Sequence, residues 1–562
     1  MKKPWMKTSL VALLVIALTL LAPLACLADE SVMEKYPLIT DPNINEPGTY
    51  PIANEMAKLS IGVVQNGSVI TYAYGENFYT TFMQDKTNIA LDIELFPATD
   101  ASQKLELMVN SNAKLPDILI QMGIENDITR YSFAQAGAII PLDEYFDQLG
   151  IEVRRGAELI GPTIYEDALK YTRSPDGHVY GIPEWDRAMN NHYTNRAWIN
   201  QTFLDALGLE MPETQEDLLT VLRAFRDGDP NGNGKKDEIP MTAAIGSNEL
   251  FRWLLNMFMY SDAHTNYYTA IEDGKLDVAY DKDEWRDCLR FGRMLVEEGL
   301  IVPQSFTQDG TQLTALASSD PQIVGVGVAL SVTSMGSNMP DYFGIGALKG
   351  DNGAQWTTYR TQAPYSVFAI TKDCENPALA FLFGTSGYAD ELLMITRRYG
   401  IPDTDWEYVQ PEENAAGMYE FAGYPAYMRQ INQVWGVPHQ SSWNGMCLPK
   451  FNRYELSSGM AWDGNQSNSE YKQAEVIERF RQYAPDPSTL FVKNIYTLEE
   501  LEETNEYRAS LLQYVNESIA LFMMGTMDIE KDWDSYLKEL EKLHYKEILA
   551  IDQEAYTRTQ AN

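Results

Sequence analysis

The chain has 562 residues, 45% of them hydrophobic, which is enough for two or more compact lobes and argues against wholesale disorder. Its 80 acidic residues outnumber its 43 basic ones, giving a formal charge of -37. This charge repels phosphate backbones and anionic membrane surfaces, so neither nucleic acid nor loose membrane attachment is expected.

The N-terminus has the pattern of a secretory signal peptide. Lys2, Lys3 and Lys7 precede an apolar run over residues 10–22 that is too short to span a membrane comfortably. Small residues and then acidic ones follow this run. We therefore assign residues 1–28 to a signal peptide.

Two processing routes are open after this signal. Leu24-Ala25-Cys26 resembles a bacterial lipobox, in which Cys26 would be lipidated, although Pro23 stands where that pattern prefers a branched aliphatic residue. Cys26-Leu27-Ala28 also fits a signal peptidase site that would release a soluble protein. We favour the lipid anchor on Cys26, on the outer face of the cell membrane.

The other cysteines, Cys288, Cys374 and Cys447, are an odd number at wide spacing, which is no disulfide framework. One disulfide is possible, and three buried thiols are the favoured interpretation. There is no CxxC or HExxH motif and the five histidines are scattered, so zinc is not expected.

After the signal, residues 29–56 are rich in Pro, Asn, Asp and Glu and have little periodicity, which indicates a flexible tether. A strand at 58–64, a helix capped by Asn77, an alternating strand at 90–98, a helix at 101–115 and a buried strand at 116–122 follow. This order predicts a parallel sheet covered by helices.

A helix with Thr214 as N-cap and Asp217 three residues later leads into the loop "DPNGNGKKDE". Oxygen-bearing side chains stand at its positions 1, 3, 5 and 9, and a glycine stands at position 6, a spacing that can wrap around a calcium ion. Pro240 occupies position 12, where an EF-hand has its bidentate Glu, so Glu238 would close the site from position 10. The alternative is a solvated Asn/Gly turn; the composition favours calcium.

The remaining segments are mainly helical. Residues 282–301 form an amphipathic pattern that Gly299 ends, and residues 498–559 predict a helical tail of about three helices. The stretch "GVGV" at Gly325 indicates a strand of small residues. No repeat and no second membrane span is seen.

Several segments together resemble the family 1 extracellular solute-binding proteins of ABC importers, in particular large Gram-positive lipoproteins and alginate-oligosaccharide-binding proteins. The similar segments are "KTNI" (86–89), "LPDIL" (115–119), "GAIIPLDEY" (137–145), "DGHVYGIP" (176–183), "LDALGLEMPET" (204–214), "DPNGNGKKDEIP" (229–240), "EEGLIVPQSFTQD" (297–309) and the C-terminal stretch at 533–556. Most are weak singly, but their order and the loop are specific. The resemblance extends from about residue 58 to the end.

The resemblance implies an α/β, two-lobed periplasmic-binding-protein-like fold, with discontinuous lobes joined by hinge strands and a helical C-terminal tail. It divides the solute-binding domain, 57–562, into lobe 1 (about 57–185 plus 361–445) and lobe 2 (about 186–360 plus 446–562). It also implies a structural Ca²⁺, because this family closes the loop with Glu at position 10. Its ligands would be the side chains of Asp229, Asn231, Asn233, Asp237 and Glu238 and the carbonyl of Lys235.

Sugar-binding clefts combine flat apolar faces with planar polar groups. Tryptophans with polar neighbours near strand ends are therefore ligand candidates, although most of the eleven tryptophans are expected to lie in the core. The candidates are Trp185, Asp186, Arg187, Glu76, Asn77, Trp435, Gln440 and Trp443.

The expected function is the extracellular capture of a carbohydrate, an oligosaccharide in the favoured interpretation, by a monomeric, non-catalytic protein that delivers it to ABC permease subunits. Two alternatives stay open: a secreted glycoside hydrolase, since the many carboxylates could supply an acid and a base, and a binding protein that feeds a membrane sensor. No GxSxG or GxxxxGK[ST] motif supports another enzyme class.

Overall fold

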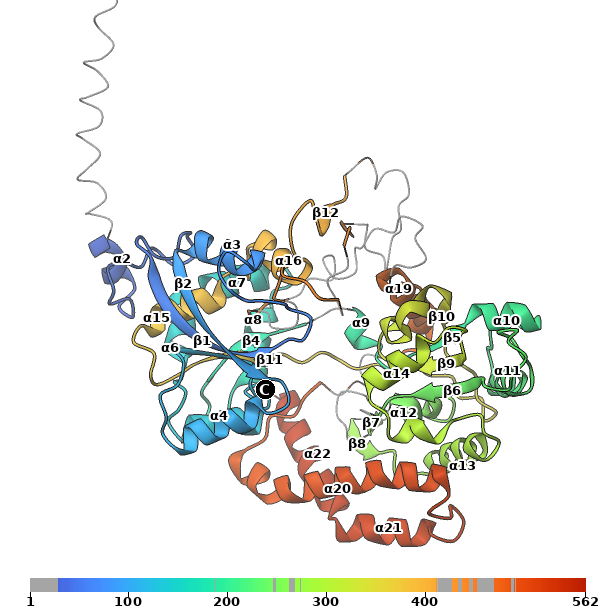
Figure 1. Ribbon diagram of the computed structural model, residues 1–562. Helices are drawn as coiled ribbons and strands as arrows, with labels where there is room; N and C mark the ends of the chain where they lie inside the picture. The colour runs from blue at the N-terminus through green and yellow to red at the C-terminus, as the bar shows by residue number, and fades with distance from the viewer. Residues whose placement is uncertain are drawn as a thin grey trace, which may run out of the picture. The chain divides into compact units, whose positions relative to one another are not determined.

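The computed structural model describes residues 29–186, 189–245, 249–261, 268–272, 274–410, 412, 427–432, 437–443, 448–451, 469–486, 490 and 492–561. These residues form two compact units, coloured by residue number in Figure 1. Unit 1 takes its residues from the chain up to Trp185, from Pro364–Trp406 and from Asn432–Phe451, and unit 2 takes them from the intervening and C-terminal segments. Each unit is therefore discontinuous in sequence.

Unit 1 is built on a five-stranded sheet. Its strands, in the spatial order β2-β1-β3-β11-β4, are β2 (Ile89–Pro97), β1 (Ala57–Gln65), β3 (Ile118–Ile120), β11 (Tyr365–Ile370) and β4 (Ile182–Glu184). β1 pairs in parallel with β2 and β3, whereas β11 runs antiparallel to both β3 and β4. The parallel strand-helix-strand order predicted for the first part of the chain is thus confirmed. β4 begins at Ile182, within the segment 176–183 that resembles the family.

The helices of unit 1 connect these strands. They are α2 (Asp29–Lys35), α3 (Phe78–Thr87), α4 (Ala101–Asn110), α5 (Asp127–Gln135), α6 (Asp143–Leu149), α7 (Ile151–Glu158), α8 (Ile164–Thr172), α15 (Pro377–Thr385) and α16 (Glu391–Tyr399). Asn77 caps α3 as predicted, because its side chain accepts a hydrogen bond from the Thr80 N–H. Phe381 of α15 contacts Phe146 of α6 edge-to-face, with 5.0 Å between the ring centroids.

The prediction of a flexible tether over residues 29–56 is wrong for most of this segment. The side chains of Ile39, Ile44 and Ile52 are at most 5% exposed and belong to the core of unit 1. The Ile52 N–H also donates to the Thr87 carbonyl at 3.0 Å. The segment follows an irregular path, so its apolar residues do not recur at the spacing of a helix or a strand. A search for such spacing therefore cannot detect that they are buried.

Unit 2 contains a four-stranded sheet in the order β10-β5-β9-β6 and a two-stranded sheet of β7 and β8. The strands are β5 (Ala197–Asn200), β6 (Ile239–Ala243), β9 (Val324–Val328), β10 (Tyr342–Gly344), β7 (Thr269–Glu272) and β8 (Lys275–Val278). β6 and β9 are parallel, whereas β5 is antiparallel to β9. A pair of short strands, β12 (Trp406–Tyr408) and β13 (Met428–Gln430), completes the described strands.

Small residues in β9 let large side chains approach its backbone. A Cβ on Gly325 would lie 2.3 Å from the ring of Phe225, and a Cβ on Gly327 would lie 2.4 Å from Met335. Any larger residue at either position would therefore displace a fully buried side chain. The predicted strand of small residues is confirmed, and the close contacts explain its composition.

The helices of unit 2 include a long C-terminal group. The α-helices are α9 (Met189–His192), α10 (Gln201–Leu207), α11 (Gln215–Asp227), α12 (Glu249–Leu255), α13 (Asp283–Glu297), α14 (Gly310–Ala317), α19 (Ser469–Phe480), α20 (Leu498–Met524), α21 (Trp533–Lys542) and α22 (Tyr545–Ala561), with 3-10 turns at Pro303–Phe306, Val332–Asp341 and Arg481–Tyr483. Thr214 and Asp217 form the predicted capping box of α11, and α13 ends two residues before Gly299, whose φ is +71°.

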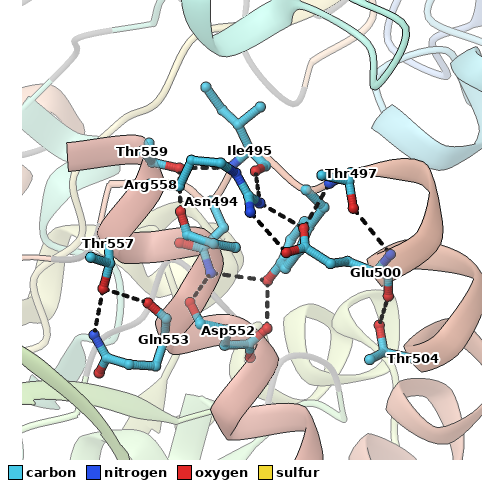
Figure 2. Close-up of polar contacts among 12 residues, drawn as sticks. Asn494, Ile495, Thr497, Glu500, Thr504, Asp552, Gln553, Thr557, Arg558 and Thr559 are labelled. Carbon is cyan, nitrogen blue, oxygen red and sulfur yellow. Dashed lines mark hydrogen bonds and ion pairs between the residues drawn. The ribbon is translucent and has the colours of Figure 1, made fainter. Parts of the chain in front are cut away.

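Helices α20, α21 and α22 confirm the predicted tail (Figure 1), and a polar network joins α20 to α22 (Figure 2). Arg558 of α22 binds Glu500 of α20 at 2.6 Å, and Asp552 of α22 accepts two bonds from Arg508 of α20. Because Arg508 and Asp552 are almost wholly buried, each would be costly without the other.

Some sequence predictions lie outside the described residues, namely the signal peptide at 1–28 with Cys26, and Cys447. Within the described residues, Cys288 and Cys374 are free and buried. In that same part of the chain, no helix is long and apolar enough to cross a membrane.

Candidate functional site

The loop predicted to bind calcium folds around the oxygens of its own side chains. The Asp229 carboxylate accepts hydrogen bonds from the N–H groups of Asn233 and Gly234 at 3.0 and 2.9 Å. The amide oxygen of Asn231 accepts from the Asn233 N–H, and that of Asn233 accepts from the Lys235 N–H. The alternate spacing thus directs these oxygens toward the loop's backbone, as in a chain of Asx turns.

Glu238 provides the test of whether the loop fits a metal ion. Both of its carboxylate oxygens are buried, and neither has a hydrogen-bond partner among the residues that the structure describes. Burial raises the pKa of Glu238, and the negative charges of Asp237 and Asp229 raise it further. A buried, unpartnered carboxylate beside two other acids suits a hard cation with oxygen ligands.

The loop is not closed as a metal centre, however. No group of three or more His, Cys, Asp or Glu side chains is gathered for metal binding anywhere in the described ranges. Asn233 instead donates its amide N–H to the Asp237 carboxylate at 3.1 Å, and Asn231 donates to the Gln322 carbonyl at 2.9 Å. The residue types therefore fit calcium, whereas closure of the site would require Asn233 to turn its amide oxygen toward the acids.

A second candidate site lies at one edge of the sheet in unit 1. The strand directions bring the carboxyl ends of β1, β2, β3 and β4 and the amino end of β11 to the same edge. The residues at this edge that are half-buried include two amides and two aromatic side chains: Asn66, Gln121, Trp185 and Tyr365. Open α/β sheets bind ligands at this edge, and this combination of side chains suits sugar rings and their hydroxyls.

A buried ion pair holds the end of β4 in place. Lys450 donates to the Glu184 carboxylate at 2.8 Å, and both side chains are less than 10% exposed. The neighbouring Trp185 N–H donates to the Lys450 carbonyl at 2.8 Å, and Trp185 forms a parallel bridge with Phe451. Two segments that are remote in sequence thus fix the backbone at Trp185 together.

The equivalent edge of unit 2 is formed by the carboxyl ends of β6 and β9 and the amino end of β5. Ile245 and Leu330, which follow β6 and β9, are 58% and 41% exposed. Arg196, which precedes β5, is fully buried and donates to the Leu330 carbonyl and to the Gln473 amide oxygen. Burial raises the pKa of the nearby Glu249, while the Arg196 charge lowers it. This edge therefore combines the exposed aliphatic side chains of Ile245 and Leu330 with a buried arginine that lies near the acidic side chain of Glu249.

The opposite, amino edge of the unit 1 sheet has a different character. A cavity of about 660 Å³ lies there, with a lining that includes Asp41, Asp117 and Asp373 and no aromatic side chain. Because it lacks a flat apolar face, this cavity does not suit a sugar ring.

Two predicted ligand residues are corrected by the structure. Trp443 is completely buried, donates its indole N–H to the Thr80 hydroxyl at 2.7 Å and contacts the Tyr79 ring edge-to-face. Asn77 is also completely buried, and its amide donates to the carbonyls of Thr71 and Ser442 while its oxygen caps α3. Both side chains are packing and capping residues of unit 1.

Of the other predicted ligand residues, some lie at or near a sheet edge, some are exposed, and two are not described. Trp185 is at the edge described above, and Asp186 accepts a bond from Asn191 at 2.8 Å. Glu76 and Gln440 are exposed, and they lie on segments joined by the Phe78 N–H bond to the Gln440 carbonyl. Arg187 and Trp435 lie outside the described residues.

Sequence reasoning missed Asn66, Gln121 and Tyr365. Asn66 directly follows β1, and Gln121 directly follows β3, whose segment was predicted as a buried strand. Asn66 is the second residue after the strand predicted at 58–64, and Gln121 lies near the end of the strand predicted at 116–122, so a search for polar residues around the carboxyl ends of the predicted strands would have found both. Tyr365 begins an antiparallel strand, so only the topology places it at this edge.

Two α/β units, each with candidate binding residues along one sheet edge, define a two-lobed protein of the periplasmic-binding type. The chain belongs to the bacterial extracellular solute-binding protein family, which matches residues 66–387. Both the predicted fold class and the predicted family are confirmed.

Two curated proteins are similar to this chain, one of them over most of its length. It is 27% identical over 502 residues to the fructooligosaccharide ABC transporter substrate-binding protein FusA of Streptococcus pneumoniae, covering 85% of this chain and 86% of FusA. It is 29% identical over 217 residues to lipoprotein LipO of Bacillus subtilis, covering 35% of this chain and 40% of LipO.

Solved structures agree on the fold. FusA of S. pneumoniae in complex with kestose has a TM-score of 0.72 and 24% identity, covering 90% of this chain and all of that one. An EF-hand mutant of FusA has the same TM-score at 23% identity, with 90% and 100% covered. Alginate-binding protein AlgQ2 has a TM-score of 0.68 and 18% identity, with 91% and 100% covered.

Proposed function

We propose that this protein captures an oligosaccharide outside the cell and delivers it to the permease subunits of an ABC transporter. The observation that carries this proposal is the row of half-buried amide and aromatic side chains at the carboxyl edge of the unit 1 sheet. Amides can bond pairs of sugar hydroxyls, while aromatic faces cover the C–H surface of a ring. The likeness to FusA supports a fructooligosaccharide as the first ligand to test.

A neutral sugar suits the described residues better than an acidic one. The one arginine identified at the unit 2 edge, Arg196, is buried and lies near Glu249, and the chain as a whole is strongly acidic. Long-range repulsion would slow the approach of a polyanion such as alginate. The exposed aliphatic pair Ile245 and Leu330 offers further apolar surface for a sugar ring.

We propose that both units contribute to the binding of the ligand; the units differ from the lobes expected from the sequence, because residues 407–431 lie in unit 2 and residues 446–451 in unit 1. Trp185, Asp186, Glu76 and Gln440 stay as ligand candidates, as do Arg187 and Trp435 outside the described residues.

We propose a structural Ca²⁺ in the loop before β6. The side-chain oxygens of Asp229, Asn231, Asn233, Asp237 and Glu238 and the Lys235 carbonyl would hold it. When bound, the ion would supply positive charge that compensates three neighbouring carboxylates. The unpartnered Glu238 carboxylate supports this proposal, as does the EF-hand of FusA.

We propose that the mature protein is a monomer anchored by a lipid on Cys26 at the outer face of the cell membrane. The lipobox-like sequence supports this, and the match to a lipoprotein is consistent with it. Metabolic labelling with a fatty acid tests it: label on the wild type and none on Cys26→Ser is expected. A released, unlabelled wild-type protein would instead support the signal peptidase route.

Ligand titration tests the main proposal. The purified protein is titrated with kestose, other neutral oligosaccharides and alginate oligosaccharides, followed by calorimetry and by the melting temperature. We expect saturable binding of a neutral oligosaccharide, a higher melting temperature and no release of reducing sugar. Release of reducing sugar would support the alternative of a glycoside hydrolase, and failure to bind any oligosaccharide would overturn the proposal.

A further inference from the structure

A chain of hydrogen bonds crosses the amino edge of the unit 2 sheet and begins in the loop proposed to bind calcium, residues 229–238. This loop leads directly into β6, which lies beside β9 in the sheet order β10-β5-β9-β6 (Figure 1). Asn231 donates its amide N–H to the carbonyl of Gln322, two residues before β9, at 2.9 Å. The loop is thus bonded to a second strand segment besides the strand that it precedes.

The side chain of Gln322 continues the chain to the other two strands. Its amide oxygen accepts from the Asn200 amide at 2.6 Å, at the end of β5, and its amide N–H donates to the Asp341 carboxylate at 2.5 Å, directly before β10. The direction of both bonds is fixed, because an ionised carboxylate only accepts and because the Asn200 oxygen already accepts from the N–H groups of Thr202 and Phe203. One glutamine therefore connects the ends of β5, β9 and β10.

The bond to Gln322 orients one of the proposed calcium ligands. Because Gln322 holds the nitrogen of the Asn231 carboxamide, the oxygen of the same group is turned to the loop, where it accepts from the Asn233 N–H at 3.0 Å. A calcium ligand must present oxygen, whereas an amide that is free to rotate can present nitrogen instead. Asn233 shows the difference, since its nitrogen bonds Asp237 within the loop and its amide would have to turn over before it could bind the ion.

The partners of Gln322 are held firmly. Asn200 is fully buried and caps α10, and Gln322 and Asp341 are half-buried. Tyr342, next to Asp341, donates its hydroxyl to the Val324 carbonyl of β9 at 2.5 Å. Groups that orient a metal ligand in this way typically change metal affinity by about 10- to 100-fold when they are removed.

We propose that Gln322 is a positioning residue for the calcium site, which orients the Asn231 oxygen and joins the metal loop to all four strands of the unit 2 sheet. The Gln322 backbone holds Asn231, and the Gln322 side chain fixes that backbone through Asn200 and Asp341. This inference rests on the proposed calcium site. It predicts that calcium stabilises the amino edge of the whole sheet, beyond the loop that binds it.

The test measures calcium affinity by calorimetry and backbone hydrogen exchange by mass spectrometry, in calcium and in chelator, on the full-length protein. Gln322→Met replaces the amide by an unbranched side chain of similar size. Asp341→Ala removes the acceptor of the Gln322 N–H, whereas Asp341→Asn keeps an oxygen in its place. The control is Gln304→Ala, because Gln304 is an exposed glutamine of the same unit.

In the wild type, we expect calcium to slow exchange in the loop and also at the ends of β5, β9 and β10 that Gln322 connects. Gln322→Met should bind calcium at least about tenfold more weakly and lose the slowing outside the loop. Asp341→Ala should also bind calcium more weakly. Asp341→Asn and Gln304→Ala should bind it within about twofold of the wild type.

Two results would overturn this inference and leave the calcium site in place. One is a Gln322→Met variant that binds calcium as tightly as the wild type, and the other is a wild type in which calcium slows exchange only within residues 229–238. Should Gln322→Met fail to fold, Asp341→Ala decides, and wild-type calcium affinity in that variant would overturn the inference. A wild type that binds no calcium would overturn both the inference and the proposed site.

Discussion

Glu238 should have opposite effects on stability with and without calcium. In the metal-free protein, its two buried carboxylate oxygens lack partners among the described residues, and burial together with Asp237 and Asp229 raises its pKa. Replacing it by Gln removes the buried charge at almost constant shape. Glu238→Gln should therefore stabilise the metal-free protein but prevent calcium from stabilising it.

The expected magnitudes follow from burial and from mass action. A buried charge without a partner costs more than a buried neutral amide, so Gln relieves only the difference between the two, on the order of 1 kcal/mol. Calcium at about 100 times its Kd would stabilise the wild type by about 2.7 kcal/mol. At roughly 2 °C per kcal/mol for a large domain, Glu238→Gln should melt about 2 °C higher in chelator and lose a calcium-dependent rise of about 5 °C.

The raised pKa of Glu238 also predicts the direction in which stability changes with pH. Because the pKa of Glu238 is raised above its ordinary value of 4.5 in the folded state, the folded metal-free protein binds this proton more tightly than the unfolded chain. The resulting stability is complete below pH 4.5 and is lost as the pH rises through the raised pKa. Glu238→Gln should lack this contribution.

The assay is thermal unfolding of the wild type, Glu238→Gln and the exposed control Glu210→Gln, each in chelator and in calcium, between pH 4 and pH 8. Glu210→Gln removes the same charge from the same unit and should behave as the wild type does. A Glu238→Gln variant that melts lower than the wild type in chelator would refute the reasoning about its burial. A wild type that melts at the same temperature in calcium as in chelator would refute the metal site.

Three further predictions concern the core of the protein. Trp443→Ala should lower the free energy of unfolding by about 3–5 kcal/mol, measured by denaturant titration, because a fully buried ring is removed; a loss below 1 kcal/mol would contradict its place in the core. Lys450→Met should cost about 3–5 kcal/mol by leaving Glu184 unpaired, and the double variant with Glu184→Gln should recover most of it; equal losses in both variants would disprove the coupling. Burial raises the pKa of the Cys288 thiol, and that of Cys374 to about 12, so neither should react with a thiol reagent at pH 8 before unfolding; rapid reaction of the native protein would contradict this.

Local features of the protein were predictable because their causes lie within a few residues. The Asn77 cap, the Thr214 and Asp217 capping box and the end of α13 before Gly299 each depend on bonds or backbone angles within one helical turn. The parallel order of the first three strands follows from their alternation with helices. The spacing of oxygen-bearing side chains that is typical of calcium loops likewise lies within ten consecutive residues, 229–238.

The sequence by itself therefore determined many of the helices and strands, since short-range patterns carry them, and its resemblance to a known family indicated the fold class. Only the tertiary structure decided which side chains reach a binding edge. Trp443 is buried by a bond to Thr80, 363 positions away, and the supposed tether is ordered by the core against which Ile39 and Ile52 lie. Gln121 lies at the sheet edge in a left-handed turn, which is bonded to β11 and packed on the underlying apolar cluster. Burial and strain depend on neighbours distant in sequence, and no local pattern records them.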